Sequence, residues 1–319
     1  MRSRRPRPRR PLRVLLYQVL TLALLAALAL WLAHNTAENL RLKGIPSGFD
    51  FLAQAAGFDI GDSLIAFAPG DSYSRALIAG LINTLRVALL AIPLSALLGS
   101  VLGLGRMSRN LPLRSLSTAY VEVFRNIPLL LQLLAWYFVL TEILPPVADA
   151  WQPAPGVFLS KSGLAFALPF DVPRHEGLAI VGGGSLTPEF LALLAGLVCY
   201  SSAYIGEIVR AGFAAVPSGQ TLAATALGLS RRQTQIEVVL PQALRLILPA
   251  ATNQFLALTK NSSLAIAIGY PDLVAVANTS INQTGRAVEC VSLIMAVYLG
   301  LSLFTALLMR WTERRMRWA

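Results

Sequence analysis

Six long runs of apolar residues, separated by shorter polar segments, dominate the pattern of the chain. Each run is near or above the roughly 20 helical residues that cross a hydrocarbon core of about 30 Å. The pattern therefore predicts an all-α fold, a polytopic membrane helix bundle with about six spans. The expected spans cover residues 14–33, 77–105, 117–144, 189–212, 247–277 and 287–309.

The first apolar run follows the basic stretch "MRSRRPRPRR", a combination that a secretory signal peptide also shows. Its apolar part, "VLLYQVLTLALLAALALWLA", is longer than the roughly 7–15 residues of a signal-peptide core. We therefore interpret it as a retained span. It belongs to an N-terminal region, residues 1–76, that precedes the main bundle at residues 77–315.

Composition supports a membrane protein. Of the 319 residues, 55% are hydrophobic and only 13% are charged, about half the charged fraction of a soluble domain. The net charge of +11 could suggest a nucleic-acid partner, but its distribution indicates topology instead. Eighteen lysines and arginines fall in one set of connecting segments and six in the other. The positive-inside rule then places both termini in the cytoplasm, and nucleic acid is excluded as a partner.

Two outer loops are long. The loop at about 35–75 mixes Gly, Asp and Phe and could form short interfacial helices. The loop at about 145–188 is rich in Pro and Gly, which predicts an ordered periplasmic loop or hairpin.

A polar segment at about 214–246 is too long for a simple turn between two spans. Ser218 is a potential N-cap, Gly228 breaks the helical pattern, Ser230 can cap a second helix and Pro241 ends or bends it. We predict two short helices joined by a Gly-centred turn and lying along the membrane. A lid resting on lipid would explain the same pattern. The apolar face expected to be buried consists of Leu222, Ala226, Leu229, Ile236, Val239 and Leu240.

The stretch "AATALGLSRRQTQIEVVLP" resembles the cytoplasmic loop of ATP-binding-cassette (ABC) importer permeases. That loop has the pattern Glu-Ala-Ala, three residues, Gly, nine residues, Ile, one residue, Leu-Pro. The matching residues are Ala223, Ala224, Gly228, Leu240 and Pro241. Val238 stands at the isoleucine position and Leu222 at the glutamate position, the latter a real departure. The resemblance implies that this segment docks into a groove of a separate cytoplasmic ABC ATPase.

The resemblance extends from about Asn83 to Arg315. "YVEVFRNIPLLLQLLAWYF" and "PAATNQFLALTKNSSLA" look like the polar amino acid branch, and most like permeases for general L-amino acids. The segment after Pro145 looks shorter than in such relatives. The resemblance implies a type I ABC importer transmembrane domain in the bacterial inner membrane. It also implies a sister permease, with a heterodimer favoured, and a periplasmic amino-acid-binding protein.

No cofactor is expected in this chain. It contains no G-x-x-x-x-G-K-[ST] phosphate loop, so ATP and Mg would be bound by the partner ATPase. Two cysteines inside predicted spans indicate packing, and two distant histidines, neither in a cluster of carboxylates or cysteines, indicate no metal site.

Charged residues at membrane depth need a partner or a purpose because their insertion costs at least about 2.5–3.5 kcal/mol each. Glu122 with Arg125, and Glu207 with Arg210, are three residues apart and can pair on one helix face. Each pair either fixes helix depth at the interface or lines the translocation path.

Two further segments are candidates for the substrate path. Pro128 removes a backbone donor and leaves the carbonyl near Phe124 free, while Asn126 and Gln132 could face the bundle interior. A kink that serves packing alone would look the same.

Lys260 interrupts the fifth predicted span, and we expect it to face the bundle near Glu207 or Glu122. Three polar side chains could together bind the charged groups of a zwitterion: Asn126, Asn261 and Ser262.

Three other functions compete with an amino acid importer. An ion-gradient-driven transporter normally shows internal repeats, and none is evident here. A membrane scaffold would leave the buried charges without a purpose. An ABC permease for phosphonate, sulfate or a metal chelate differs only in the cargo.

Overall fold

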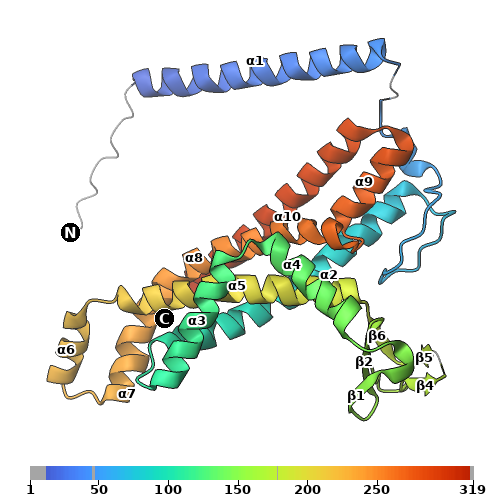
Figure 1. Ribbon diagram of the computed structural model, residues 1–319. Coiled ribbons are helices and arrows are strands. Elements are labelled where there is room, and N and C mark those ends of the chain that lie inside the picture. Colours follow the sequence, from blue (N-terminus) through green and yellow to red (C-terminus); the bar gives the residue numbers. More distant parts are fainter. Residues whose placement is uncertain (1–11, 45–46, 178, 317–319) are drawn as a thin grey trace.

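The computed structural model describes residues 12–44, 47–177 and 179–316; the basic N-terminal segment and Arg317 lie outside these ranges. The helices form an elongated bundle with α6 and α7 at one end and the β-strands at the other (Figure 1). The helices are α1 Leu12–Leu42, α2 Tyr73–Arg106, α3 Leu111–Asn126, α4 Leu129–Phe138, α5 Pro188–Ala214, α6 Ser218–Ala226, α7 Arg231–Gln233, α8 Leu240–Asn261, α9 Leu273–Thr284 and α10 Ala287–Met316. Short 3-10 segments cover Asp50–Ala53, Val147–Asp149 and Ser262–Ile268, and π-helical turns cover Val139–Ile143 and Thr234–Val239.

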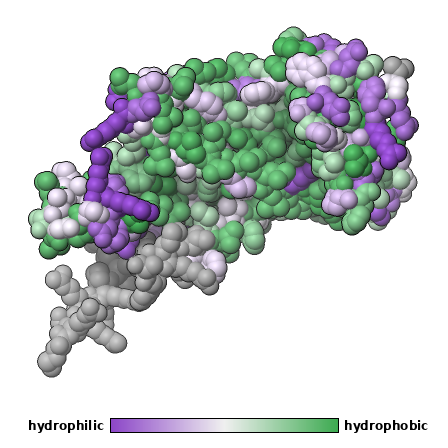
Figure 2. Space-filling model, turned by 90° about the horizontal axis from the view of Figure 1, so that it is seen from below, coloured by the Kyte–Doolittle hydropathy of each residue, from purple (hydrophilic) through white to green (hydrophobic). Residues whose placement is uncertain are grey.

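Within the described ranges, four single helices are long and apolar enough to cross a membrane: α1, α2, α5 and α10. The third and fifth predicted spans are each broken. The α3–α4 pair bends by 105° and the pair formed by residues 231–268 and α9 bends by 52°. If each bent pair is one span, the total rises to six. Figure 2 shows a broad hydrophobic belt between two ends where hydrophilic residues gather, as a bundle that crosses a bilayer requires.

The 145–188 segment forms the ordered hairpin structure that its composition predicts. Its antiparallel strands make a four-stranded sheet of order β1-β2-β3-β6 and a separate β4-β5 pair. The strands are β1 Trp151–Ala154, β2 Val157–Ser160, β3 Gly163–Phe166, β4 Arg174–Glu176, β5 Ala179–Val181 and β6 Gly184–Leu186. In the other outer loop, one 3-10 turn at Asp50–Ala53 forms where short interfacial helices were expected.

Capping residues determine where several helices begin. Ser72, Asn110 and Thr187 each accept a hydrogen bond from the backbone N–H three residues on, and so start α2, α3 and α5. Asp272 does the same for α9, with a distance of 2.8 Å from its Oδ1 to the Ala275 nitrogen. These contacts satisfy backbone donors that no helical carbonyl reaches.

The centre of the bundle is the crossing of α2 and α5, where glycines allow close approach. A Cβ built on Gly103 would lie 2.7 Å from the Gly206 carbonyl oxygen and 2.7 Å from Val209 Cβ. A Cβ added at Gly99 would likewise come too close to the Ile205 side chain and to the Ser202 carbonyl oxygen. Small residues at such contacts let two membrane helices pack backbone to backbone.

Gly103→Ala is expected to destabilise the protein by about 1–3 kcal/mol because a methyl group there overpacks the crossing against backbone atoms. Gly300→Ala is the matched control: it also lies within a helix, but its added Cβ meets nothing within 4 Å. That change should stabilise by about 0.5–1 kcal/mol, since alanine is the better helix former. Unfolding by detergent titration measures both. Equal effects at the two positions would mean that the crossing is not closely packed.

Helix α1 stands apart from the bundle (Figure 1), and no residue of its most apolar stretch is buried. The chain that follows it returns to the bundle as a segment, residues 47–72, that we call the outer strap. The strap packs Phe51, Ala56 and Ile60 against α2, α9 and α10.

Candidate functional site

The polar segment at 214–246 forms a corner at the end of the bundle opposite the β-strands (Figure 1). Helix α6 ends at Gly228, whose φ of +83° is the left-handed conformation that glycine adopts without strain. Ser230 then caps α7 in a capping box with Gln233, as expected. The short helix α6 and the Gly-centred turn are as predicted, but the second helix is not short. It continues from α7 through the π-helical turn Thr234–Val239 into α8, so that residues 231–268 form one long helical stretch.

Two details of this segment differ from the sequence prediction. Ser218 lies inside the first turn of α6 and makes no cap, because Pro217 holds the N-cap position. Pro241 does not end the second helix: it lies in the first turn of α8, and the helical stretch runs into α8 from the π-helical turn Thr234–Val239.

Half of the apolar face expected to be buried is exposed, and Leu229 and Leu240 are half-buried. Val239 is buried, but Leu222 is 70% and Ile236 is 50% exposed, and the neighbouring Leu227 is 81% exposed. Among the matched positions, Ala224 is buried, Leu240 is half-buried, and the others are exposed: Ala223, Gly228 and Pro241. The helical pattern identified the helices correctly, but it could not show that the leucines point away from the bundle.

Ionic contacts connect α2, α3 and α5 near the same end. Arg106 donates to Glu207 at 2.6 Å, and Arg210 donates to the other oxygen of Glu207 at 2.5 Å. The predicted Glu207–Arg210 pair is therefore present, and Arg106 joins it from another helix. Two arginines sharing one carboxylate form charge-assisted hydrogen bonds, which are stronger than neutral ones.

The predicted pairing of Glu122 with Arg125 is wrong. Glu122 lies 3.4 Å from Arg106, and the Arg125 guanidinium sits over the Tyr204 ring, 5.2 Å from its centre. Each side chain finds its partner on another helix. A spacing of three residues permits a pair, but α2 and α5 offer better-placed partners.

The break between α3 and α4 has the cause that the sequence indicates. Pro128 has no N–H to donate to the Phe124 carbonyl, and the Gln132 side chain donates to that oxygen at 2.8 Å. Gln132 also donates to the Ile127 carbonyl at 2.9 Å and is buried, whereas Asn126 is exposed. The freed carbonyls are thus satisfied within the chain.

Lys260 does not approach Glu207 or Glu122. Its side chain is exposed and pairs with no carboxylate in the part of the chain that the structure describes. Asn261 is half-buried beside it, while Ser262 is buried and donates its hydroxyl to the Thr259 carbonyl at 2.8 Å. The expectation that Lys260 is neutralised inside its own subunit is therefore wrong.

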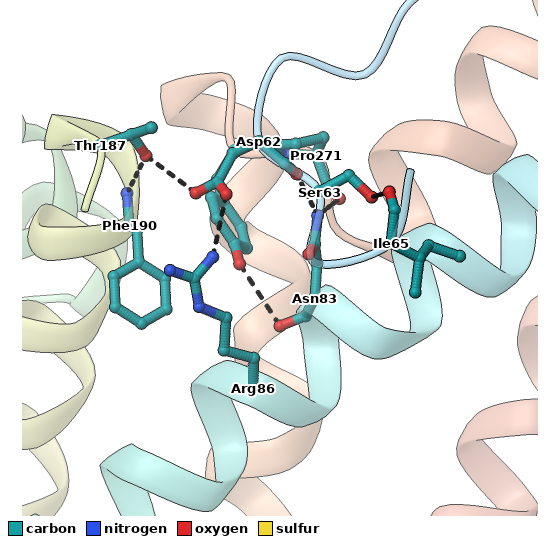
Figure 3. Close-up of polar contacts among 9 residues, drawn as sticks. Asp62, Ser63, Ile65, Asn83, Arg86, Thr187, Phe190 and Pro271 are labelled. Carbon is teal, nitrogen blue, oxygen red and sulfur yellow. Dashed lines mark hydrogen bonds and ion pairs between the residues drawn. The ribbon is translucent and has the colours of Figure 1, made fainter. Parts of the chain in front are cut away.

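A polar cluster at the opposite end was not foreseen. Asp62 from the outer strap accepts from Arg86 of α2 at 2.9 Å and from the Thr187 hydroxyl at 3.2 Å (Figure 3). The Arg86 guanidinium stacks on Phe190 of α5, 4.2 Å from the ring centre. Asn83 donates to the Asp62 and Pro271 carbonyls at 2.6 and 3.0 Å.

One signal in the sequence could have identified this cluster. Arg86 lies inside an expected span, where an arginine is costly enough to mark a functional position. Its partner Asp62 lies in an irregular loop 24 residues earlier, so no helical periodicity connects the two.

The family of the chain follows from comparison with known proteins. Residues 75–318 match the family described as "Binding-protein-dependent transport system inner membrane component". The chain belongs to this family. It is thus a multi-pass inner-membrane permease subunit that works with a separate ATPase and a binding protein, and the ion-gradient and scaffold alternatives fall away.

Two relatives in this family align with almost the whole chain. The general L-amino acid transport system permease protein AapQ of Rhizobium johnstonii is 39% identical over 95% of this chain and 92% of its own length. The putative amino-acid ABC transporter permease protein YhdX of Escherichia coli is 40% identical, over 95% and 94%. Both alignments run over 368 positions, more than this chain's 319 residues, so these relatives carry residues without counterparts here.

A solved structure confirms the fold of a type I ABC importer permease. The crystal structure of an amino acid ABC transporter with histidines is 32% identical, with a TM-score of 0.58, covering 76% of this chain and 95% of that one. The MetNI methionine ABC transporter, 18% identical with a TM-score of 0.52, supports the fold alone.

Proposed function

We propose that this subunit forms part of the translocation path of an ATP-driven importer of L-amino acids. The observation that carries the proposal is the near full-length likeness to the general L-amino acid permease of Rhizobium johnstonii. The alternative cargo is another small polar solute, and transport measurements distinguish it from an amino acid.

The corner at Gly228 is the proposed docking element for the ATPase, with Ala223, Ala224, Leu240 and Pro241. Support comes from its position at one end of the bundle and from the two leucines, Leu222 and Leu227, that it exposes to solvent. A soluble partner that covers them would remove apolar surface from water. The proposed orientation, with both termini in the cytoplasm, would put this corner on the ATPase side.

The proposed substrate path runs along α3, the α3–α4 break, Glu207 of α5 and the end of α8. Four exposed charged or polar side chains support it, because contact with lipid would be costly for each of them: Glu122, Arg125, Asn126 and Lys260. The proposed residues are Glu122, Arg125, Asn126, Pro128, Glu207, Lys260, Asn261 and Ser262.

A sister permease would enclose this path, and we favour a heterodimer. Leu222 stands where the coupling motif has glutamate, so the two halves of the importer would engage the ATPase unequally. Lys260 supports the same view, since a carboxylate from a second subunit would supply the partner that its own subunit does not.

Co-purification in a gentle detergent, followed by uptake into proteoliposomes, tests the proposal. We expect the tagged chain to bring with it an ATPase and a second permease. The complex should take up radiolabelled L-glutamate, L-histidine or L-leucine when ATP and the binding protein are supplied. A complex that hydrolyses ATP but moves none of these amino acids would refute the amino acid proposal and leave the other-cargo alternative.

A further inference from the structure

The outer strap is fixed at two places by ion pairs with the bundle. Near its start, Asp50 accepts from Arg286 of α10 at 3.1 Å. Further along, Asp62 accepts from Arg86 of α2 at 2.9 Å (Figure 3). The Asp50 side chain of the first pair is 62% exposed, whereas in the second pair Arg86 is 12% and Asp62 is 15% exposed. The strap therefore places a carboxylate inside the outer end of the bundle.

Arg86 has the surroundings of a carboxylate-binding arginine. One face of its guanidinium lies on the Phe190 ring, which fixes the plane and leaves the edge free to donate. That edge meets the Asp62 carboxylate, together with the hydroxyl of Thr187. A planar, stacked guanidinium with a neighbouring hydroxyl donor recognises a carboxylate through directed hydrogen bonds.

Asn83 adds an unused acceptor one helical turn away on the same face of α2. Its amide nitrogen faces two carbonyl oxygens, those of Asp62 and Pro271, so the nitrogen and oxygen of the amide are correctly distinguished. Its Oδ1 is buried and has no hydrogen-bond partner among the described residues. A buried acceptor without a donor is costly, and an ammonium group would satisfy it.

A cavity lies next to this cluster, behind the strap. It has a volume of about 380 Å³, within the roughly 300–1,000 Å³ typical of small-molecule sites. The strap forms one wall with Phe58, Asp59 and Ile60, and α9 forms another with Asn278 and Thr279. Pro271, whose carbonyl binds Asn83, also lines it. Pro271 and the strap are thus shared by the cavity and the contacts of the Arg86 cluster.

We propose that Arg86, Asn83 and Thr187 form an amino-acid subsite at the outer mouth, occupied in this conformation by the Asp62 carboxylate as an internal ligand. When the strap withdraws, Arg86 and Thr187 receive the carboxylate of the substrate and Asn83 Oδ1 its ammonium. The inference rests on the proposed amino acid cargo and adds a place where the cargo first binds this subunit. Asp62 competes with the substrate for Arg86, so the closed strap keeps the subsite empty.

Glycine is the sharpest probe because it carries only the two charged groups that amino acids share. Saturation-transfer NMR of the assembled importer in nanodiscs should detect glycine binding to the Asp62→Asn variant at least about tenfold more tightly than to the wild type. Acetate should compete with it. The double variant Asp62→Asn with Arg86→Gln should lose the binding.

Asp71→Asn is the matched control, since it removes the same charge from the same strap but from an exposed pair with Arg75. It should bind glycine no better than the wild type. Glycine binding of equal strength in Asp71→Asn, or its persistence in the double variant, would overturn the proposal because neither depends on freeing Arg86.

A second measurement serves if Asp62→Asn does not assemble. In proteoliposomes, Arg86→Gln should lower the amino acid taken up per ATP hydrolysed by roughly tenfold or more, the value of one charge-assisted hydrogen bond. Hydrolysis stimulated by the binding protein should persist, and Arg86→Lys should recover part of the uptake. A purely structural ion pair would lower both activities together, and that result, or an unchanged ratio, refutes the subsite. Failure of the wild type to take up any amino acid would instead refute the proposed cargo.

Discussion

Gly228→Val is expected to lower both uptake and binding-protein-stimulated ATP hydrolysis by roughly tenfold or more, although the protein still assembles in the membrane. Gly228 occupies the left-handed region with a φ of +83°, where an L-residue costs about 1–2 kcal/mol and a β-branched residue costs more. Its N–H bonds the Thr225 carbonyl, and the next N–H, of Leu229, bonds the Ala224 carbonyl. Valine would break this turn and redirect α7 relative to α6. Uptake and hydrolysis assays on the same proteoliposomes measure the effect.

The open space around Gly228 shows which property of valine would cause the defect in Gly228→Val. A Cβ added there meets nothing within 4 Å, so the backbone conformation is the cause of any defect and crowding is not. Gly228→Asn is the control, because asparagine tolerates the left-handed region, and it should retain most of the activity. Gly219→Val is a second control in α6 with equally open surroundings and no positive φ. Full activity in Gly228→Val would contradict the proposed role of the corner.

Local signals in the sequence were sufficient for the main helices of this bundle, although they gave Ser218 and Pro241 the wrong roles. Hydrophobic runs located the spans, and the Gly228 break and Ser230 cap located the corner, because these features depend on residues within one or two turns. Pro128 likewise indicated a broken helix with a free carbonyl. Helix breaks and caps of this kind depend on residues that are close together in the sequence, so the sequence alone can predict them.

Local signals could not predict which charged side chains pair between different helices. Glu122 had an arginine at helical spacing, yet it lies against Arg106, which the chain places nearby only after α2 and α3 fold together. Asp62 reaches Arg86 from an irregular loop, and Lys260 finds no carboxylate where one was expected. Long-range polar contacts follow from tertiary packing, whereas periodicity records only the neighbours along one helix.

The shared carboxylate of Glu207 leads to the largest expected loss of stability. Its two oxygens accept from Arg106 at 2.6 Å and from Arg210 at 2.5 Å, and its side chain is only 25% exposed. Glu207→Gln keeps the shape but removes the negative charge that both guanidinium groups share. Arg106, which is 12% exposed, would keep only the exposed Glu122 as a carboxylate partner, and breaking a buried pair costs about 3–5 kcal/mol, the upper limit expected here. Unfolding by detergent titration of the assembled importer measures the loss.

Glu122→Gln is a matched comparison because Glu122 touches the same arginine. It lies 3.4 Å from Arg106 and is 56% exposed, so water and salt screen the pair, and its removal should cost at most about 1 kcal/mol. The two variants share the residue type, the substitution and the partner Arg106; they differ in burial and in Arg210, a second guanidinium that only Glu207 contacts. If the two variants unfold at the same detergent concentration, Glu207 does not hold α2 against α5. The glycine-lined crossing of these helices would then carry their association alone.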